Sequence, residues 1–207
     1  MHEKEISRKD NNRAIIRGKI REEFSLDHEV RQESFYATKV AVSRHDGTID
    51  MIPVIISEFL LNSEILSEKN VGKTAEMRGQ FRSRNKEAHL KLFLFVKEFN
   101  FVDDDNSQNE IFLRGYICKK PVYRSNKIKS DLLIAVHRKY KQSDYLPCVT
   151  LDANAARASL MEIGDCIEAE GRIQSRKYFK KDPSNPKKGE WREAYEISID
   201  RMEKVEE

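Results

Sequence analysis

Tyrosines flanked by lysine and arginine are the residues of this chain best suited to contact a flat, anionic ligand. Tyr140 lies in HRKYK, Tyr178 lies in SRKYFKK, and Tyr145 follows soon after Tyr140. An aromatic ring offers a face for stacking against a base, and neighbouring cations neutralise phosphate. Tyrosines in strands are more often half-buried packing residues. Basic flanks at strand ends favour stacking for Tyr140 and Tyr178, and both interpretations stay open for Tyr145.

Basic residues accompany these tyrosines through the second half of the chain. The whole sequence has 38 Lys+Arg against 35 Asp+Glu, a net charge of +3, but segments 114–141 and 171–188 are strongly basic. Such blocks indicate a face for a polyanion, although a single lysine is more often only solvated. Strand alternation will turn some of these cations away from any one face. The candidates for phosphate contact are Arg114, Lys119, Lys120, Arg124, Arg138, Lys139, Arg172, Arg176 and Lys177.

No residues have the spacing of a catalytic or metal site. Cys118, Cys148 and Cys166 form no CxxC pair, the five histidines are scattered, and Gly72–Lys73–Thr74 lacks the earlier glycine of a phosphate-binding loop. We therefore expect a binding protein with no enzymatic activity, cofactor or metal. Charged residues interrupt the chain too often for a membrane span, and no apolar leader opens it. With 39% hydrophobic residues, a cytoplasmic globular protein is expected.

An internal repeat determines where these residues belong. NNRAIIRGKI (11–20) matches QNEIFLRGYI (108–117), and VGKTAEMRGQFRSR (71–84) matches IGDCIEAEGRIQSR (163–176). VAVSR and DMIPVII match IAVHR and DYLPCVT in the same order. Matching blocks in one order indicate two homologous units. We predict an N-terminal arm at 1–10, a first domain at 11–102, an acidic linker at 103–108 and a second domain at 109–207.

Each unit is expected to contain five strands and one helix. The helices are expected at 57–67 and 152–163, the second with Asp152 as its N-cap. Three strands, a helix and two strands in about 100 residues are typical of the OB-fold, a small Greek-key barrel. We predict a mainly β chain of two tandem OB-folds, each a five-stranded barrel with a short helix between its third and fourth strands. The expected strands are 14–20, 36–43, 51–56, 74–82 and 90–101, then 111–117, 132–137, 145–151, 166–175 and 194–202.

The sequence also predicts the structure of two further segments, the strand at 90–101 and the connection at 179–191. Alternation along the strand at 90–101 should place four phenylalanines on one face, interpreted as core or an oligomer interface. These are Phe93, Phe95, Phe99 and Phe101. The segment FKKDPSNPKKGEW (179–191) predicts a flexible basic loop that either folds over a bound strand or is simply solvated.

The second unit resembles the bacterial single-stranded DNA-binding protein family. The resemblance lies in NEIFLRGYICKKP, LLIAVHRKYKQSDYLP, REAYEISIDRMEKVE and, most specifically, the pattern GD-x(5)-GR-x(2)-SR-x-Y that ends at Tyr178. The first unit resembles the family more weakly, through RGKI, VAVSR, DMIPV and RGQFRSR. The similar region spans roughly residues 11–205.

This resemblance implies three stacking positions, at Tyr140, Tyr145 and Tyr178. The first unit has Met51 in the place of Tyr145, and no aromatic residue near Lys86, in the place of Tyr178. Its aromatic platform is therefore degenerate. We expect the second unit to grip the strand, and the first to act as scaffold, oligomer surface or auxiliary phosphate binder.

The resemblance further implies largely sequence-independent binding of single-stranded DNA in replication, recombination or repair. It also implies that two chains form a homodimer with four barrels, and that the protein associates with the nucleoid. The family's acidic tail, which recruits replication proteins, is not seen after RMEKVEE, which suggests a specialised binder. Two alternatives stay open: a primosome-like OB module that bridges replication partners, and a single-stranded RNA binder.

Overall fold

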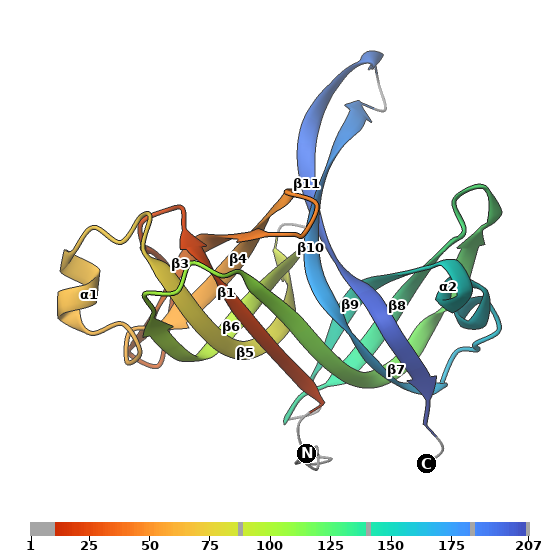
Figure 1. Cartoon of the computed structure of the whole chain (residues 1–207), viewed down its shortest axis with the longest axis horizontal. Helices are drawn as coiled ribbons and strands as arrows, with labels where there is room; N and C mark the ends of the chain where they lie inside the picture. The colour runs from red at the N-terminus through yellow and green to blue at the C-terminus, as the bar shows by residue number, and fades with distance from the viewer. Residues whose placement is uncertain (1–10, 87–88, 140–141, 183–184, 206–207) are drawn as a thin grey trace.

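The computed structural model describes residues 11–86, 89–139, 142–182 and 185–205, so the arm expected at 1–10 lies outside it. The chain is mainly β, as the sequence predicted, and Figure 1 shows the strands of the two repeats next to each other along the longest axis. The first repeat contains β1 (Asn12–Ile20), β2 (Ser25–Val30), β3 (Glu33–Ser43), β4 (Ile49–Ser57), β5 (Thr74–Lys86) and β6 (His89–Phe101). The second contains β7 (Gln108–Arg124), β8 (Lys129–His137), β9 (Ser143–Leu151), β10 (Cys166–Asp182) and β11 (Asn185–Lys204).

The eleven strands form one continuous sheet in the order β10-β11-β9-β8-β7-β1-β5-β6-β4-β3-β2. Antiparallel pairing of β1 with β7, from Asn12 opposite Leu113 to Arg17 opposite Gln108, joins the two repeats. Further pairings of β1 with β3 and of β7 with β10 curl each repeat back on itself. The prediction of a mainly β chain is confirmed, whereas the two predicted five-stranded barrels are not cleanly divided, because backbone groups along β1 and β7 satisfy one another across the repeat boundary.

The first repeat also has a strand that the sequence analysis missed. β2 pairs with β3 at the end of the sheet, with an irregularity between Leu26 and His28. Its sequence SLDHEV mixes charged and apolar residues without regular alternation, so it gives no clear strand signal.

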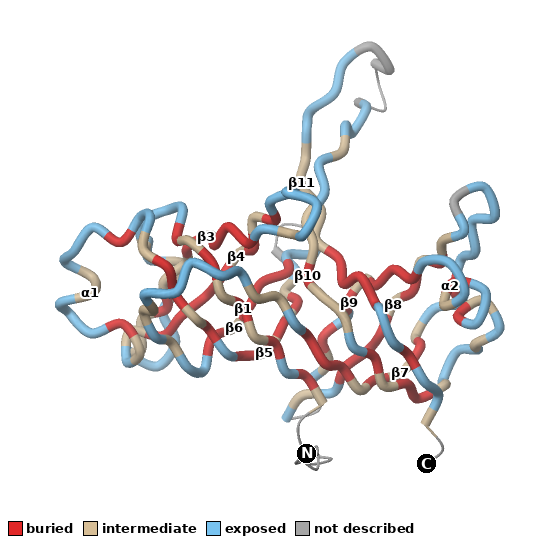
Figure 2. The backbone as a smooth tube through the Cα atoms, viewed as in Figure 1, coloured by how far each residue is buried: buried red, intermediate tan, exposed pale blue. Residues whose placement is uncertain are grey.

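Inward-facing side chains fill one main hydrophobic core. On β1 burial alternates, with Ala14, Ile16 and Ile20 completely buried, and β8 continues the pattern with Ile134. Figure 2 shows the buried residues concentrated along the strands of both repeats. Full burial of each such isoleucine stabilises the fold by about 1.5–3 kcal/mol before the entropic cost of ordering it.

Both helices are shorter than the sequence predicted. α1 (Ser63–Ser67) starts late because a turn follows Ser57, whose carbonyl accepts from Leu60 N at 3.0 Å, and the Asn62 side chain caps the helix by accepting from Ile65 N at 2.8 Å. α2 (Asp152–Ser159) has Leu151 at its N-cap without a side-chain cap bond, so the expected capping role of Asp152 is wrong. Within the described ranges, neither helix has the length and apolar character that a membrane crossing requires.

A glycine bulge recurs at the same place in the two repeats. The register shifts between Arg78 and Gly79 on β5, and again between Glu170 and Gly171 on β10. A Cβ at Gly79 would lie 2.1 Å from the carbonyl oxygen of Phe95, and one at Gly171 would lie 2.0 Å from that of Ser198. Only glycine permits this close approach of two backbones.

The bulge changes which face the β6 side chains occupy. Before it, Phe93 and Phe95 lie in a small second cluster with Phe35 and Ile55; after it, Phe99 and Phe101 pack against the main core. The expectation that the four phenylalanines share one face is therefore wrong, because the extra residue at the bulge shifts the period-2 alternation.

The segment expected to be a flexible basic loop is largely a β-ribbon. Tyr178 lies opposite Arg192, Phe179 opposite Trp191 and Lys180 opposite Glu190, in continuous antiparallel register. Figure 1 shows this distal part of β10 and β11, which we call the arm (residues 177–182 and 185–192), projecting away from the body. Figure 2 shows exposed residues along residues 179–181 and 188–191 of the arm. Backbone hydrogen bonds thus order a stretch whose composition suggests a loop.

Two buried aspartates at equivalent positions hold the repeats together. Asp50 accepts from Arg44 Nε and Nη2, both at 2.6 Å, and from Ser175 N of the second repeat at 2.7 Å. Asp144 accepts from Ser83 N of the first repeat at 2.7 Å. Each carboxylate therefore bonds to a serine of the other repeat, and both aspartates have no exposed surface.

The acidic segment between the repeats is fastened to the first one. Arg17 Nη1 lies 2.6 Å from Asp104, and Lys19 Nζ lies 3.1 Å from Asp105. Thr74 Oγ1 also donates to Asp105 at 2.8 Å. The hydrogen bond from Thr74, and then the one from Lys19, lower the pKa of Asp105.

We predict that Asp50→Ala lowers the free energy of unfolding by about 3 kcal/mol, because it leaves the Arg44 guanidinium and the Ser175 N–H without their acceptor. Urea denaturation measures the change. The exposed Asp103→Ala is the matched control and should lie within about 0.5 kcal/mol of the unmodified chain. Similar losses in the two variants would contradict the junction's role.

A second prediction concerns pH. Burial raises the pKa of Asp144, against the opposing effects of the Ser83 N–H and of Arg138. A folded pKa above the unfolded one means that this carboxyl contributes stability below about pH 4 that is lost as the pH rises through the raised pKa. Asp144→Asn cannot ionise, so its stability relative to the unmodified chain should increase between about pH 4 and pH 7. Urea denaturation at several pH values tests this, and a difference that does not vary with pH would contradict it.

Candidate nucleic-acid interface

A groove of about 690 Å³ runs between the outer face of the first repeat and the base of the arm; we call it the inter-repeat groove. β2 to β6 line one side, and β9, β10 and β11 line the other. Its aromatic and proline residues are Phe93, Tyr178, Tyr195, Pro53 and Pro147. Its basic residues are Lys39, Arg84, Lys91 and Arg192, and its acidic ones are Glu22, Asp27 and Glu193. Aromatic surface beside cations is the combination that binds single-stranded nucleic acid.

Tyr178 is the predicted stacking residue that lies in this groove. It is half-buried on β10, and the Arg176 guanidinium carbon lies 5.5 Å from its ring centroid. Such a cation–π contact holds a ring while leaving its other face available. The sequence-predicted pair Arg176 and Tyr178 is thus brought together at the base of the arm.

The other two predicted tyrosines differ in their placement. Tyr145 on β9 is 48% exposed, and its N–H donates to Ser83 Oγ of the first repeat at 2.9 Å. It shares a face of β9 with Pro147, which lines the groove. Tyr140 lies outside the described residues.

The first repeat contributes more to the groove than its sequence indicated. Arg84 Nη2 lies 2.9 Å from Asp27, and its guanidinium carbon lies 5.6 Å from the Phe93 ring centroid. Although burial opposes it, hydrogen bonds from Arg84 and His28 lower the pKa of Asp27. The pair places a guanidinium beside an aromatic ring in the groove. The alignment of Ser83–Arg84 with Ser175–Arg176 could have identified Arg84 as a site residue. No sequence pattern pointed to a place for Phe93 in this groove.

Tyr195, also missed by sequence reasoning, lines the groove as a neutral phenol. Its hydroxyl donates to Glu193 Oε2 at 2.6 Å. Burial, and then this hydrogen bond, raise the pKa of Tyr195 above its usual range. The ring supplies apolar surface to the groove and adds no negative charge.

The predicted phosphate-contacting cations do not form a single patch. Five arginines are ion-paired: Arg114 with Glu168 at 3.1 Å, Arg124 with Asp131 at 2.6 Å, Arg138 with Asp144 at 3.2 Å, Arg172 with Asp200 at 3.5 Å and Arg176 with Glu196 at 3.4 Å. The four lysines are exposed, and no ion pair to them is seen among the described residues: Lys119, Lys120, Lys139 and Lys177.

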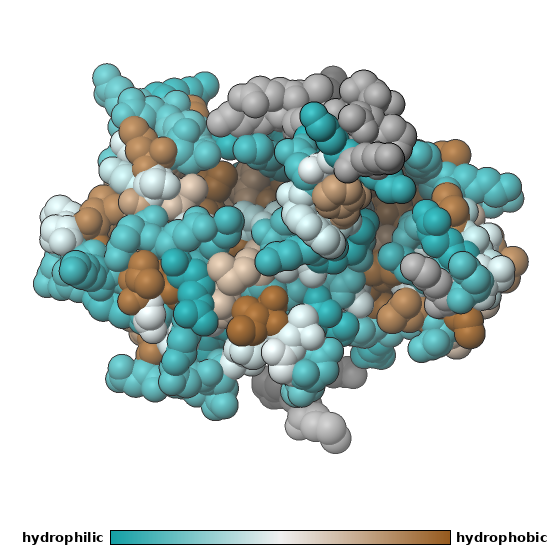
Figure 3. All heavy atoms as spheres, turned by 90° about the horizontal axis from the view of Figure 1, so that it is seen from above, coloured by the Kyte–Doolittle hydropathy of each residue, from teal (hydrophilic) through white to brown (hydrophobic). Residues whose placement is uncertain are grey.

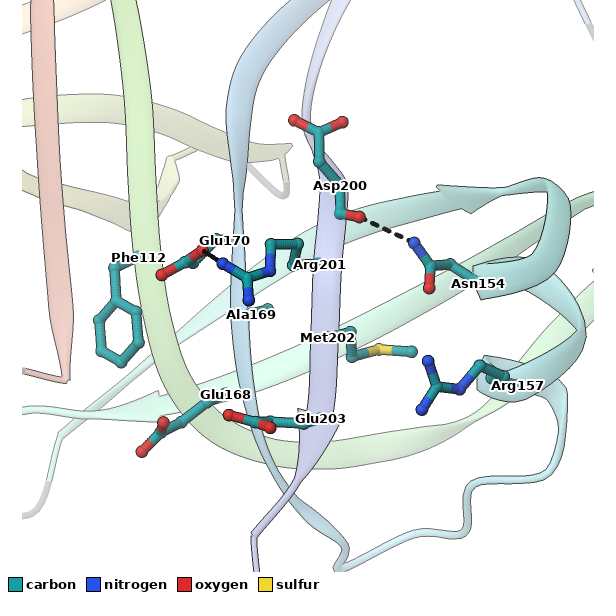
Figure 4. A pocket seen from close by; sticks show the side chains of 10 residues that line it. All are labelled: Phe112, Asn154, Arg157, Glu168, Ala169, Glu170, Asp200, Arg201, Met202 and Glu203. Atoms are coloured by element: carbon teal, nitrogen blue, oxygen red, sulfur yellow. Dashed lines mark hydrogen bonds and ion pairs between the residues drawn. The ribbon is translucent and has the colours of Figure 1, made fainter.

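A separate pocket of about 380 Å³ on the second repeat has the opposite charge. Figure 4 shows Glu168, Glu170, Asp200 and Glu203 around it, with Arg201 paired to Glu170. Arg114 and Arg172 are held by two of these carboxylates. A phosphate group would be repelled here, which leaves these two arginines poorly placed for a nucleic acid.

The arm carries an aromatic pair that sequence reasoning also missed. The rings of Phe179 and Trp191 lie edge to face with centroids 5.6 Å apart, and the side chains are 43% and 71% exposed. Lys177, Lys180 and Lys181 accompany them on β10. A tryptophan this exposed beside lysines is suited to stacking. The basic neighbours of Trp191 in KKGEWR could have identified it as a candidate from the sequence.

The face seen from above is predominantly hydrophilic. Figure 3 shows hydrophobic residues there in small patches separated by polar ones. Among the described residues, no three His, Cys, Asp or Glu side chains are placed to hold a metal ion. Cys148 is buried, and desolvation raises the pKa of its thiol.

Comparisons with known proteins address the fold. No protein-family model matches this chain, and no curated protein does. The wild-type single-stranded DNA-binding protein of Thermus aquaticus matches with a TM-score of 0.74 at 13% identity, over 95% of this chain and 93% of that one. A deletion mutant of that protein gives 0.69 at 13% identity, over 95% of each chain. The N-terminal domain of PriB from Thermoanaerobacter tencongensis matches 46% of this chain and 100% of its own, at 28% identity and a TM-score of 0.40.

The chain therefore has the fold of a bacterial single-stranded DNA-binding protein with two similar units in one chain. The match to the Thermus aquaticus protein extends over nearly the whole length, so the resemblance indicated by the sequence is confirmed at the level of the fold. At 13% identity the match assigns no role to any single residue.

Trp191 provides a direct test of the arm, because it is the only tryptophan in the sequence. We expect its emission to resemble that of tryptophan in water, with strong acrylamide quenching in the folded protein and little change on unfolding, because the side chain is already 71% exposed. Fluorescence spectroscopy with and without urea measures this. A blue-shifted, quencher-resistant emission would show that the arm folds against the body.

Proposed function

We propose that this chain is a non-catalytic protein that binds single-stranded DNA with little sequence preference. The observation that carries the proposal is the inter-repeat groove, where Tyr178 of the second repeat and Arg84 and Phe93 of the first lie together. The fold adds support, because the Thermus aquaticus protein with the same architecture is a single-stranded DNA-binding protein. Replication, recombination and repair are the processes that need such a protein.

In the proposed mode, bases stack and phosphates meet cations. Tyr178 and Tyr145 offer rings at the groove and on β9, and the Trp191–Phe179 pair extends the aromatic surface onto the arm. Each stacked base contributes about 1–3 kcal/mol and tolerates any sequence. The exposed Lys119, Lys120, Lys139 and Lys177 supply phosphate contacts, and release of counterions makes the affinity fall steeply with salt.

The two repeats share this work unequally in the proposal. The second repeat supplies the stacking tyrosines, and the first supplies a buried aromatic floor at Phe93 with Arg84 and Lys91 beside it. The first repeat is then an auxiliary phosphate binder rather than only a scaffold. We also propose that two chains assemble into a homodimer, which would contain four repeats.

Anisotropy of labelled oligo-dT at low and moderate salt tests the proposal, with duplex DNA and RNA as competitors. We expect salt-sensitive binding that duplex does not displace. Tyr178→Ala and Tyr145→Ala should each weaken it about tenfold, because each removes a stacking ring. Met51→Ala is the matched control, since Met51 N donates to Ser175 Oγ just as Tyr145 N donates to Ser83 Oγ.

Other outcomes would redirect the assignment. Equal losses from Met51→Ala and Tyr145→Ala would remove the stacking role of Tyr145. Strong competition by single-stranded RNA would shift the substrate to RNA. Absence of binding at low salt would overturn the proposal in favour of a module for protein partners.

A further inference from the structure

A third cavity, of about 630 Å³, lies at the junction of the repeats and is separate from the inter-repeat groove and from the acidic pocket. It collects four cations, two from each repeat: Arg82 and Lys97 from the first, Arg138 and Lys139 from the second. The other lining groups include the neutral amides of Asn11, Asn12, Gln80 and Gln142, and no carboxylate is among the described residues that line it. Like charges gathered from two repeats repel one another unless an anion joins them.

Arg82 is the best-oriented of these cations. Its guanidinium carbon lies 3.8 Å from the Phe95 ring centroid, and Nη2 donates to Gln80 Oε1 at 2.8 Å. Its Nε is buried, and none of the described residues accepts a hydrogen bond from it. Burial, and then repulsion from Arg138, lower the pKa of this guanidinium. Stacking on Phe95 and the bond to Gln80 fix the orientation of this guanidinium, which preorganises it for an oxyanion.

Asp144 is the acidic residue that pairs with one of these cations, and both of its oxygens lie beside groups of the junction. One oxygen accepts from Ser83 N at 2.7 Å, and the other lies 3.2 Å from Arg138 Nε without a well-aligned hydrogen bond. One carboxylate cannot balance four cations. The cavity therefore keeps a net positive charge in the folded chain.

The matching place in the second repeat shows that the fold does not require these cations. Lys97 is the extra residue of the bulge opposite Gly79, and Asp200 is the extra residue of the bulge opposite Gly171. Arg82 likewise corresponds to Gln174, three residues after the equivalent glycine. Asp200 pairs with Arg172 at 3.5 Å. The same backbone thus carries balanced charge in one repeat and unbalanced positive charge in the other.

We propose that this junction cavity binds a backbone phosphate of a single strand where the strand passes from one repeat to the other. The inference rests on the proposed function for the source of the phosphate, and it goes beyond it in assigning a site to Arg82 and Lys97, which no motif indicated. The Arg82 guanidinium donates to the phosphate from the wall of the cavity, and Lys97 and Lys139 approach it from opposite repeats. Because both repeats contribute, the site exists only while the junction is intact.

The test compares charge-removing variants of this cavity with a matched surface lysine. Lys97→Gln should weaken oligo-dT binding about tenfold at low salt and reduce the slope of log affinity against log salt by about 0.7, the value for one phosphate contact. Lys69→Gln removes the same charge from an exposed position of the first repeat outside both cavities, and should change neither quantity. Arg82→Gln should behave like Lys97→Gln, with urea denaturation to confirm that it folds.

The outcomes separate this inference from the proposed function. If the unmodified chain binds oligo-dT but Lys97→Gln matches Lys69→Gln in affinity and salt slope, the cavity assignment is overturned and single-strand binding stands. If the unmodified chain does not bind oligo-dT, both fail. Calorimetry with tripolyphosphate distinguishes the source of the phosphate: tight binding that Lys97→Gln abolishes, without an effect of this variant on oligo-dT, would overturn the strand assignment in favour of a free phosphate compound.

Discussion

The reciprocal contact between the buried aspartates and the serines of the opposite repeat is the constraint on which the candidate sites depend. Asp50 of the first repeat accepts a hydrogen bond from Ser175 of the second, and Asp144 of the second accepts one from Ser83 of the first. Each repeat therefore satisfies a buried carboxylate of the other. An unpaired buried carboxylate costs several kcal/mol, which penalises any other arrangement of the repeats. Asp50, with two short bonds from Arg44, is better satisfied than Asp144, and the asymmetry leaves positive charge near Asp144.

Much of the fold could be predicted because duplicated residues perform duplicated tasks. Asn12 and Asn109, aligned by sequence, each bridge a neighbouring strand through both a donor and an acceptor: Asn12 bonds to Phe81, and Asn109 bonds to Ile173. The pairing of β1 with β7 was not predictable, since the alternation of a strand shows which face is buried and not which neighbour completes its edge. The bulges opposite Gly79 and Gly171 were not predicted, and neither was the resulting change of face along β6.

The candidate sites were harder to predict than the fold, for a physical reason. Tyr178 and Arg176 are close in sequence and on one face of one strand, so local pattern found them. The inter-repeat groove and the junction cavity combine residues far apart in the chain, such as Arg84 with Tyr178 and Lys97 with Arg138. No spacing rule relates such residues, and only the relative placement of the repeats brings them together. Strand pairing within the second repeat, of β7 with β10 and of β10 with β11, places Arg114 and Arg172 beside carboxylates that strand patterns could not identify.

The pairing scheme also has a consequence for how this chain behaves at high concentration. Because each repeat curls back on itself and β1 joins β7, β2 is the described strand that has a partner on only one side, β3, along its whole length. Open strand edges are where unrelated chains join into aggregates, and charged residues on such an edge discourage this. β2 carries Asp27, His28 and Glu29 within six residues, a polar guard at the open end of the sheet. The pairing of β1 with β7 likewise covers two strand edges that separate repeats would expose.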